Sequence, residues 1–496
     1  MTFFRFPMRT SAFARRARLG ARVSGLLAAS FLAGCQLDEV VRATDPDIID
    51  PSFVQSASGA DGVRVGTLGR FNANTTGGES MFLYGGLMGD EFTTGDTFTQ
   101  RIETDQRALT PENGNVQTAY RGLHLVRIGS LQARELLRRY PFPAGQQEWR
   151  LAEMYFTEAY MINLLAEHFC NGQPLSSIEG FVETPSARIP TDSLYRIAQA
   201  KVDSGVTLIG ALATTNDVRV RNALQVLRAR IALNQGNFAL AATAASTVPT
   251  SFTWDQEHTL TVRTPGVWSL VNNQRRYIVS NNEGPLAMGF ANAVQDPRVP
   301  SCQPGTGGFN TAACAALNIT NVNSFDSNNL AVPRMRYQLI WETDSRNVSL
   351  VNGLQARLFE AEAQNRLGNF TTASTGSLAI LNALRAAPPA YVLPGRTITG
   401  LTPLVDPATA DGQRDLIFRE KGFWLFGTGH RFGDLRRMMR QYNMTQNQVW
   451  PNGVWQINRV PGYSTDVTFP TPAAEANNPL VPQSQPGVPA CIDRNP

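Results

Sequence analysis

The chain has 496 residues, of which 42% are hydrophobic and 9% aromatic, so it is long enough for one large helical body or two or three ordinary cores. This composition argues against disorder along most of the chain. The formal net charge of +4 comes from six arginines within residues 1–34, and the rest of the chain holds 38 basic against 40 acidic residues. Because no run of basic residues could form a patch, we expect no binding of nucleic acid.

The first 34 residues predict an export signal. An arginine-rich stretch ends at Arg22, an apolar core follows at residues 23–32, and two small residues precede Cys35. This order is that of a signal peptide, and the apolar core is too short to span a bilayer. Residues 32–35 resemble the bacterial lipobox, so we expect Cys35 to be acylated. The alternative is an ordinary signal peptide with a chance cysteine.

The segments after Cys35 differ in composition. Residues 35–65 are polar and marked by prolines, which predicts a lipid-anchored tether that leads into a body formed by residues 66–496. Within that body, residues 66–105 are rich in Gly, Thr and Asn and favour loops and short irregular elements. No later segment reaches the ~18 apolar residues that a membrane helix needs, which predicts a body tethered to a membrane by its lipid.

Apolar residues then recur at helical spacing. The pattern predicts five helical segments, at residues 116–140, 146–169, 191–212, 222–247 and 353–386. The last two segments share the sequence GNFxxA, at Gly236–Ala241 and Gly368–Ala373, each after a helix rich in Ala and Leu. A helix, a Gly-Asn-aromatic turn and a second helix are typical of tetratricopeptide hairpins, although no strict 34-residue period connects the two copies. We therefore expect a mainly α fold with a tetratricopeptide-like hairpin scaffold, around residues 115–250 and 352–440, and large irregular loop insertions.

Aromatic residues lie in the segments that lack helical periodicity. Residues 250–350 are rich in Asn, Pro and Gly, and so long an irregular stretch inside a compact body is typical of a functional loop region. Flat rings there could stack on sugars or on apolar peptide side chains, with neighbouring polar groups supplying hydrogen bonds. Alternatively, each ring fills a local gap in the core. The candidate ligand-binding residues are Phe92, Phe98, Trp268, Tyr277 and Trp341.

Four cysteines remain after Cys35, an even number that suits two disulfides in an exported protein. Three pairings are open. Cys302 and Cys314 share one Gly-rich loop, which favours a bond between them and leaves Cys170 to pair with Cys491.

Catalytic and metal-binding patterns are missing from the sequence. The four histidines are scattered, and His430 is interpreted as structural. Glu360 and Glu362 are two residues apart on a predicted helix, so they do not face each other and are interpreted as solvated surface charges. No motif for a nucleophilic serine, a zinc protease or a bound phosphate is present. We expect no enzymatic activity, no cofactor and no metal, although opposed carboxylates of a glycoside hydrolase are recognised only in space.

One segment near the end of the chain resembles a known family. Residues 414–426, RDLIFREKGFWLF, are followed by GHRFGDLRR at residues 429–437. This run is similar to one in the SusD/RagB family of outer-membrane nutrient-binding lipoproteins, and the lipobox, the hairpins, Asp296-Pro297-Arg298 and the stretch 469–480 add to the resemblance. The chain departs from the family at residues 426–428, Phe-Gly-Thr, where the family often has an acid before the glycine.

The resemblance implies a function and a partner. Members of the family bind oligosaccharides, or sometimes peptides, and sit as a lid on a TonB-dependent outer-membrane transporter. We therefore expect a non-catalytic lipoprotein, anchored in the outer membrane and exposed at the cell surface, that captures such a nutrient and delivers it to the transporter. The alternatives are a surface glycoside hydrolase or peptidase, and a tetratricopeptide scaffold that binds only other proteins.

Overall fold

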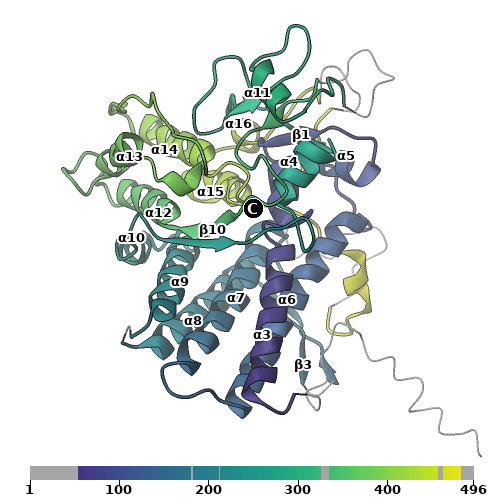
Figure 1. Ribbon diagram of the computed structural model, residues 1–496, viewed down its shortest axis with the longest axis vertical. Coiled ribbons are helices and arrows are strands. Elements are labelled where there is room, and N and C mark those ends of the chain that lie inside the picture. The colour runs from purple at the N-terminus through teal and green to yellow at the C-terminus, as the bar shows by residue number, and fades with distance from the viewer. Residues whose placement is uncertain (1–53, 180–181, 212, 325–333, 456–461, 482–496) are drawn as a thin grey trace, which may run out of the picture. The chain divides into compact units, whose positions relative to one another are not determined.

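The computed structural model describes residues 54–179, 182–211, 213–324, 334–455 and 462–481, which lie within one compact unit, Asp50–Pro496. Helices dominate this unit, and the strands are short, so the predicted mainly α class is confirmed (Figure 1). Within the described ranges, no helix is both long enough and apolar enough to cross a bilayer.

Long antiparallel helices form the scaffold, and successive helices pack side by side. The first three predicted segments are helical, as α6 (Gly114–Arg139), α7 (Gln147–His168) and α8 (Thr191–Ile209). Nearly every side chain of α7 is buried, because α6, α8 and α9 (Thr215–Asn234) surround it. A helix buried on all sides belongs to the centre of a core. The strongest helical pattern in the sequence is thus the centre of the scaffold.

Both predicted hairpins are present. α9 turns into α10 (Phe238–Ser246) at Gly236, whose φ of +73° lies in the left-handed region that favours glycine. Asn237 then caps α10, because its side chain accepts a hydrogen bond from the backbone N–H of Leu240 at 3.1 Å. The second hairpin joins α12 (Gly353–Arg366) to α13 (Ser377–Ala386), and its turn at Gly368 has a φ of +81°. α13 begins later than predicted, since residues 369–376 are irregular.

The region before residue 105 differs from the prediction of loops and short irregular elements. It contains α3 (Ala57–Ala73) and α4 (Met81–Met88). The four glycines of α3 weaken its helical pattern, but Ser56 caps the helix and its buried face packs along α6. Tertiary packing therefore overrides a low helix propensity in this segment.

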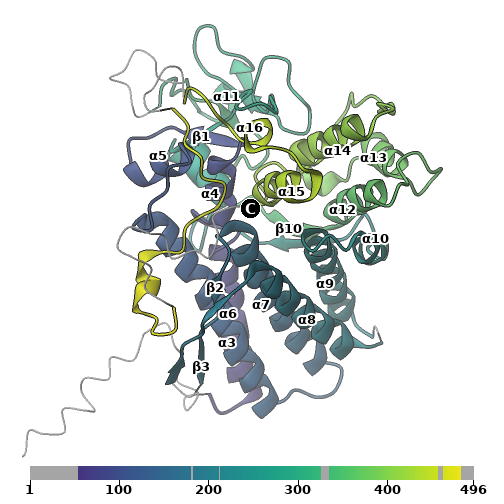
Figure 2. The ribbon, with the colours of Figure 1, turned by 180° about the vertical axis from the view of Figure 1, so that it is seen from behind.

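The remaining helices are shorter or come later in the chain. They are α5 (Thr99–Asp105), the π-helix η2 (Trp268–Asn273), α11 (Thr311–Ala316), the 3-10 helix η3 (Ala390–Val392), α14 (Ala410–Trp424), α15 (Arg431–Tyr442), α16 (Gln446–Val449) and the 3-10 helix η4 (Ala473–Asn477). Figure 2 shows α14 and α15 beside α12 and α13, and α4 and α5 on the other side of the unit.

The strands of the described ranges form antiparallel pairs, and β1–β7, β6–β10 and β8–β9 join segments distant in sequence. The pairs are β1 (Phe92–Thr94) with β7 (Tyr277–Val279), β6 (Thr253–Gln256) with β10 (Val348–Asn352), β2 (Gln173–Pro174) with β5 (Arg188–Ile189), β3 (Ser177–Glu179) with β4 (Val182–Thr184), and β8 (Ser301–Cys302) with β9 (Tyr337–Gln338). A disulfide joins Cys302 to Cys314 and closes one of the loops in the irregular region.

The last described segment of the chain is bonded to the middle of the scaffold. The N–H of Phe469 donates to the carbonyl of His168 at 2.9 Å, and the N–H of Cys170 donates back to the carbonyl of Phe469 at 2.9 Å. A little earlier, the N–H groups of Ser464 and Asp466 donate to the carbonyls of residues 106 and 107. Residues 464–469 therefore contact both the loop after α5 and the end of α7.

Candidate functional site

Two of the predicted ligand-binding rings lie in the core. Phe92 on β1 and Tyr277 on β7 meet edge to face, with ring centroids 6.0 Å apart, and both are 0% exposed. Phe426 packs on the other side of Phe92, at 5.1 Å. Since neither Phe92 nor Tyr277 has an open ring face, the prediction that they contact a ligand is corrected. Their hydrophobic area is needed to hold β1 against β7.

Phe98 is different, because its ring is 51% exposed. It lies between β1 and α5, and guanidinium groups stand over it at 5.3 Å for Arg101 and 5.1 Å for Arg276. Cations over an aromatic face are attracted by the quadrupole of the ring, whose face is electron-rich. The exposed ring of Phe98 is thus held in place by two arginines. We call Phe98, Arg101 and Arg276 the Phe98 platform.

Two acids, the partly buried Glu79 and the buried Asp96, fix the arginines of the Phe98 platform. Glu79 accepts hydrogen bonds from Nε and Nη2 of Arg101 at 2.5 and 2.7 Å, and Asp96 accepts a further one from the same guanidinium. Arg276 lies 3.6 Å from the Asp96 carboxylate, which also accepts from the N–H of Phe98 at 2.6 Å. Burial acts to lower the pKa of Arg101, but Glu79 outweighs it and raises that pKa. Arg101 is therefore held in place and stays charged at all ordinary pH values.

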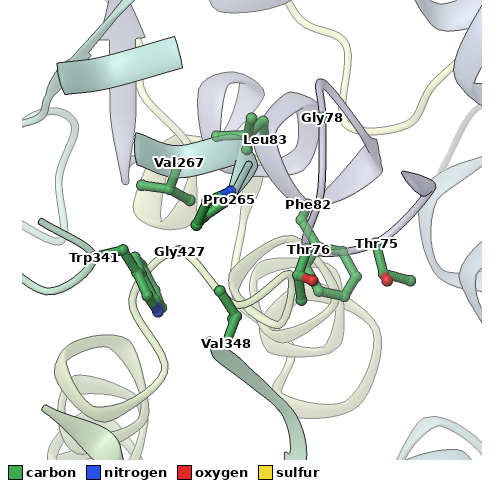
Figure 3. A pocket seen from close by; sticks show the side chains of 11 residues that line it. Thr75, Thr76, Gly78, Phe82, Leu83, Pro265, Val267, Trp341, Val348 and Gly427 are labelled. Carbon is green, nitrogen blue, oxygen red and sulfur yellow. The ribbon is translucent and has the colours of Figure 1, made fainter. Parts of the chain in front are cut away.

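Trp341 and Trp268 are less accessible. Trp341 is 6% exposed and borders a small apolar cavity, together with Val267, Phe82 and Val348, as Figure 3 shows. The cavity has a volume of about 10 Å³, which holds no more than a single water molecule. Trp341 thus packs against the core in this structure, whereas Trp268 at the start of η2 is half-buried.

The departure from the family at residues 426–428 has a structural role. Gly427 has a φ of +69°, and a Cβ atom there would lie 3.1 Å from the ring of Trp341. Its N–H donates to Oε1 of Glu91 at 2.8 Å. Glu91 is buried, and desolvation raises its pKa to about 8 even though this N–H opposes the shift. The turn requires glycine because of its backbone conformation and its close contact with tryptophan.

The diagnostic run near the end of the chain builds a buried ionic network. Lys421 on α14 donates to Glu362 at 2.5 Å and to Asp434 at 2.7 Å, and the ammonium group is fully buried. Arg437 on α15 donates to the same two carboxylates at 2.9 and 2.6 Å. Two cations and two anions thus tie α12, α14 and α15 together. We call these four residues the Lys421 network.

Two further arginine pairs connect α15 and α9 to the rest of the scaffold. Arg431 donates through Nε and Nη2 to the carboxylate of Asp90 at 2.7 and 2.6 Å. Arg230 on α9 makes a similar two-pronged contact with Glu167 on α7, at 2.8 and 2.6 Å. Burial of these charges is tolerated because each is paired and hydrogen-bonded. The sequence RFGDLRR is therefore a packing motif.

The interpretation of Glu362 as a solvated surface charge is wrong, because its side chain is 0% exposed and bonded to Lys421 and Arg437. Desolvation alone would raise its pKa, but the two cations lower it to about 2. Glu360 is also largely buried and pairs with Arg357 at 2.8 Å. His430 is buried next to Thr428, and desolvation lowers its pKa well below the usual value, which suits a structural role.

The predicted cysteine positions are only partly described. Cys35 and Cys491 lie outside the described residues. Cys170 is disulfide-bonded and buried at the end of α7. In the part of the chain that the structure describes, no group of three or more His, Cys, Asp or Glu residues could hold a metal ion.

Solved structures with the same architecture are found, although no protein-family model and no curated protein matches the sequence. A SusD superfamily protein from Parabacteroides distasonis has a TM-score of 0.61 and 12% identity, over 87% of this chain and 99% of the other. A SusD-like carbohydrate-binding protein from Bacteroides fragilis has a TM-score of 0.60 and 13% identity, over 86% and 99%. A laminarin-binding SusD-like protein has a TM-score of 0.53 and 14% identity, over 88% and 100%. This chain has the SusD fold.

Within the SusD fold, Phe98 was predicted from the sequence, but the arginines of the Phe98 platform and the acids that hold them were not. Glu79, Asp96, Arg101 and Arg276 come from two segments far apart in the chain, and nothing in their spacing joins them. The pairing of β1 with β7 brings them together, because it places the residues after Thr94 next to those before Tyr277. The one sequence signal for this group of residues was an arginine, Arg101, close to an aromatic residue, Phe98.

Proposed function

We propose that this chain binds a carbohydrate at the surface of the cell and passes it on without chemical change. The observation that carries the proposal is the Phe98 platform on a SusD fold. The exposed part of the ring offers apolar surface of the kind that packs on a sugar. Beside it, Arg276, whose side chain is 26% exposed, offers donors for hydroxyl groups. A peptide with an apolar side chain is the second ligand class that such a platform suits.

The class of ligand is supported by two of the structural neighbours. One is a SusD-like carbohydrate-binding protein and another is a laminarin-binding SusD-like protein. These two proteins are 13% and 14% identical to this chain and share its fold. We propose an oligosaccharide, since several sugar rings in a row can reach both the ring and the arginines.

A change of Phe98 to alanine should weaken binding of the cognate oligosaccharide by about 1–3 kcal/mol, by analogy with stacked bases on aromatic side chains. Phe98 to tryptophan should keep the stacking face and most of the affinity. The ring is exposed and makes no side-chain cap on α5, so the fold should persist. Isothermal titration of the purified body checks the result, with the exposed residue Leu260 changed to alanine as a matched control. Equal affinity for the Phe98 and Leu260 variants would contradict the platform.

We further propose that Cys35 carries the lipid anchor, that the body is exposed at the outer membrane, and that a TonB-dependent transporter takes up the ligand. The lipobox-like residues 32–35 support the anchor. A tether confines the protein to the membrane and raises its concentration near a membrane partner. The similarity of residues 414–437 to the SusD/RagB run supports the transporter.

Deletion of the protein from its host should abolish uptake of the cognate nutrient while its extracellular breakdown continues. A copy with Cys35 changed to serine should fail to restore uptake, because an untethered body is diluted away from its partner. A copy with Cys35 intact is the control, and uptake of labelled nutrient is the measurement. Loss of breakdown with normal import would show that the chain is an enzyme instead.

A further inference from the structure

A second hollow lies away from the Phe98 platform. It has a volume of about 510 Å³ and its lining is mostly polar, including Asp255, Ser345, Arg346, Asn347, Ser349 and Tyr391. This volume falls within the range of about 300–1,000 Å³ that is usual for small-molecule sites. Figures 1 and 2 both show β10 and α12, which border this region, on a different side of the unit from α5.

The floor of the hollow is the strand pair β6–β10. Asp255 and Ser349 are directly opposite each other in this pair, and the register shifts between Ser349 and Val351. Trp254 on the other face of β6 is buried, with its ring stacked 4.7 Å from that of Phe156. Because side chains alternate along a strand, Asp255 and Ser349 turn away from this core. The irregular register next to them bends the strand locally, and such irregularities are frequent beside functional sites.

Tyr391 forms one wall and is held rigidly. Its hydroxyl donates to the carbonyl of Thr250 at 2.7 Å and accepts from the N–H of Leu354 at 2.9 Å. Because the Tyr391 hydroxyl is already hydrogen-bonded as donor and as acceptor, a ligand in the hollow would contact the ring of Tyr391 and not its hydroxyl. A fixed ring costs little conformational entropy when a ligand packs on it.

The opposite wall is fixed by an ionic bridge. Glu342 accepts a hydrogen bond from Nε of Arg396 at 3.1 Å and lies 3.8 Å from the guanidinium of Arg346. This carboxylate connects the loop that carries Ser345 and Arg346 to the loop after Tyr391. The walls are therefore tied to each other before any ligand arrives, which is the condition for a preorganised site.

The chemistry of the lining selects the ligand. Asp255 and Arg346 balance in charge, so the hollow favours neither an anion nor a cation. Asp255 can accept from two hydroxyls, while Arg346 and Asn347 can donate, and a vicinal diol offers both partners at once. We propose that this hollow is a second carbohydrate site, which takes a neutral pyranose unit against Tyr391. This inference shares only its ligand class with the proposed function.

The test uses saturation-transfer difference NMR on the mature chain. The probe is a mixture of the methyl glycosides of glucose, galactose, mannose and xylose. Two variants alter the hollow, Asp255→Ala, which removes its carboxylate, and Ser345→Trp, which fills it from an exposed position. Asp344→Ala is the matched control, because it removes a neighbouring carboxylate outside the lining. The two hollow variants and the control are all made in the Phe98→Ala background, so that the Phe98 platform contributes no signal of its own.

If the hollow binds sugar, the wild type and the Phe98→Ala variant give a signal for at least one glycoside. Affinity falls about tenfold or more in Asp255→Ala, as expected for the loss of a charge-assisted hydrogen bond, and the signal disappears in Ser345→Trp. Asp344→Ala leaves it unchanged. A signal that survives in both hollow variants, or the absence of any signal in the wild type, overturns the second site. A signal that is present in the wild type and already lost in Phe98→Ala alone overturns it too, but leaves the proposed function standing.

Discussion

Replacement of Lys421 by methionine is expected to lower the free energy of unfolding by about 3–5 kcal/mol, the usual cost of removing one partner from a buried ionic group. Lys421 is fully buried between the carboxylates of Glu362 and Asp434. Without it, Arg437 alone would face two buried anions, and one negative charge would stay unpaired in the core. Urea unfolding followed by circular dichroism measures the change.

The chain supplies its own control for this experiment, because Lys201 is its other lysine. Lys201 pairs with Glu158 at 3.1 Å near the surface, and its side chain is 28% exposed. A change of Lys201 to methionine should therefore cost about 1 kcal/mol or less. Equal losses for the two variants would contradict a stabilising role of the Lys421 network.

Acid should destabilise the scaffold through its buried carboxylates. Desolvation would raise the pKa of Glu167, but Arg230 outweighs it and lowers that pKa to about 2, from an ordinary value of 4.5. The unfolded chain thus binds a proton that the folded chain does not, so the stabilisation is complete above pH 4.5 and is lost as the pH falls towards 2. The loss should reach about 3 kcal/mol for this group. Glu362, whose pKa is also lowered to about 2, acts in the same direction.

Urea midpoints measured between pH 6 and pH 2.5 or so test this expectation. Glu167→Gln should be less stable than the wild type at pH 6, since it leaves Arg230 without its carboxylate, and should lose less stability on acidification. Glu112→Gln, at an exposed position, is the control and should follow the wild type. The same slope for Glu167→Gln and the wild type would show that the Arg230 pair is not responsible.

The helical scaffold could be predicted where one face of a helix is apolar over several turns. α6 and α8 have that pattern, and the turns at Gly236 and Gly368 carry residues that suit the left-handed backbone. α3 was missed because its glycines resemble those of a loop, and only its packing along α6 makes the segment helical. Local patterns therefore predict elements that are stable by themselves better than elements that depend on a neighbour.

The candidate site was harder to predict for a related reason. Phe92 and Phe98 are both phenylalanines in one Thr-rich segment, yet one is 0% and the other 51% exposed. The difference arises from β7, which covers Phe92 and leaves Phe98 beyond the end of the pair. Glu362 was misjudged in the same way, because a charge that faces two other helices looks, in sequence, like a charge that faces water. Both errors come from contacts between segments that are far apart in the chain.

The bonding of residues 464–469 to the end of α7 sets a limit on when the protein can finish folding. The carbonyl of His168 and the N–H of Cys170 are hydrogen-bonded to the backbone of Phe469. Until Phe469 is in place, these two buried backbone groups lack these hydrogen bonds. The end of the central helix, α7, is thus completed only when residues 464–469 bind to it. This contact joins segments far apart in sequence and is therefore slow to form. During synthesis, a nascent chain that lacks this segment therefore has an incompletely closed core. Closure of the core follows only after almost the whole chain has been made.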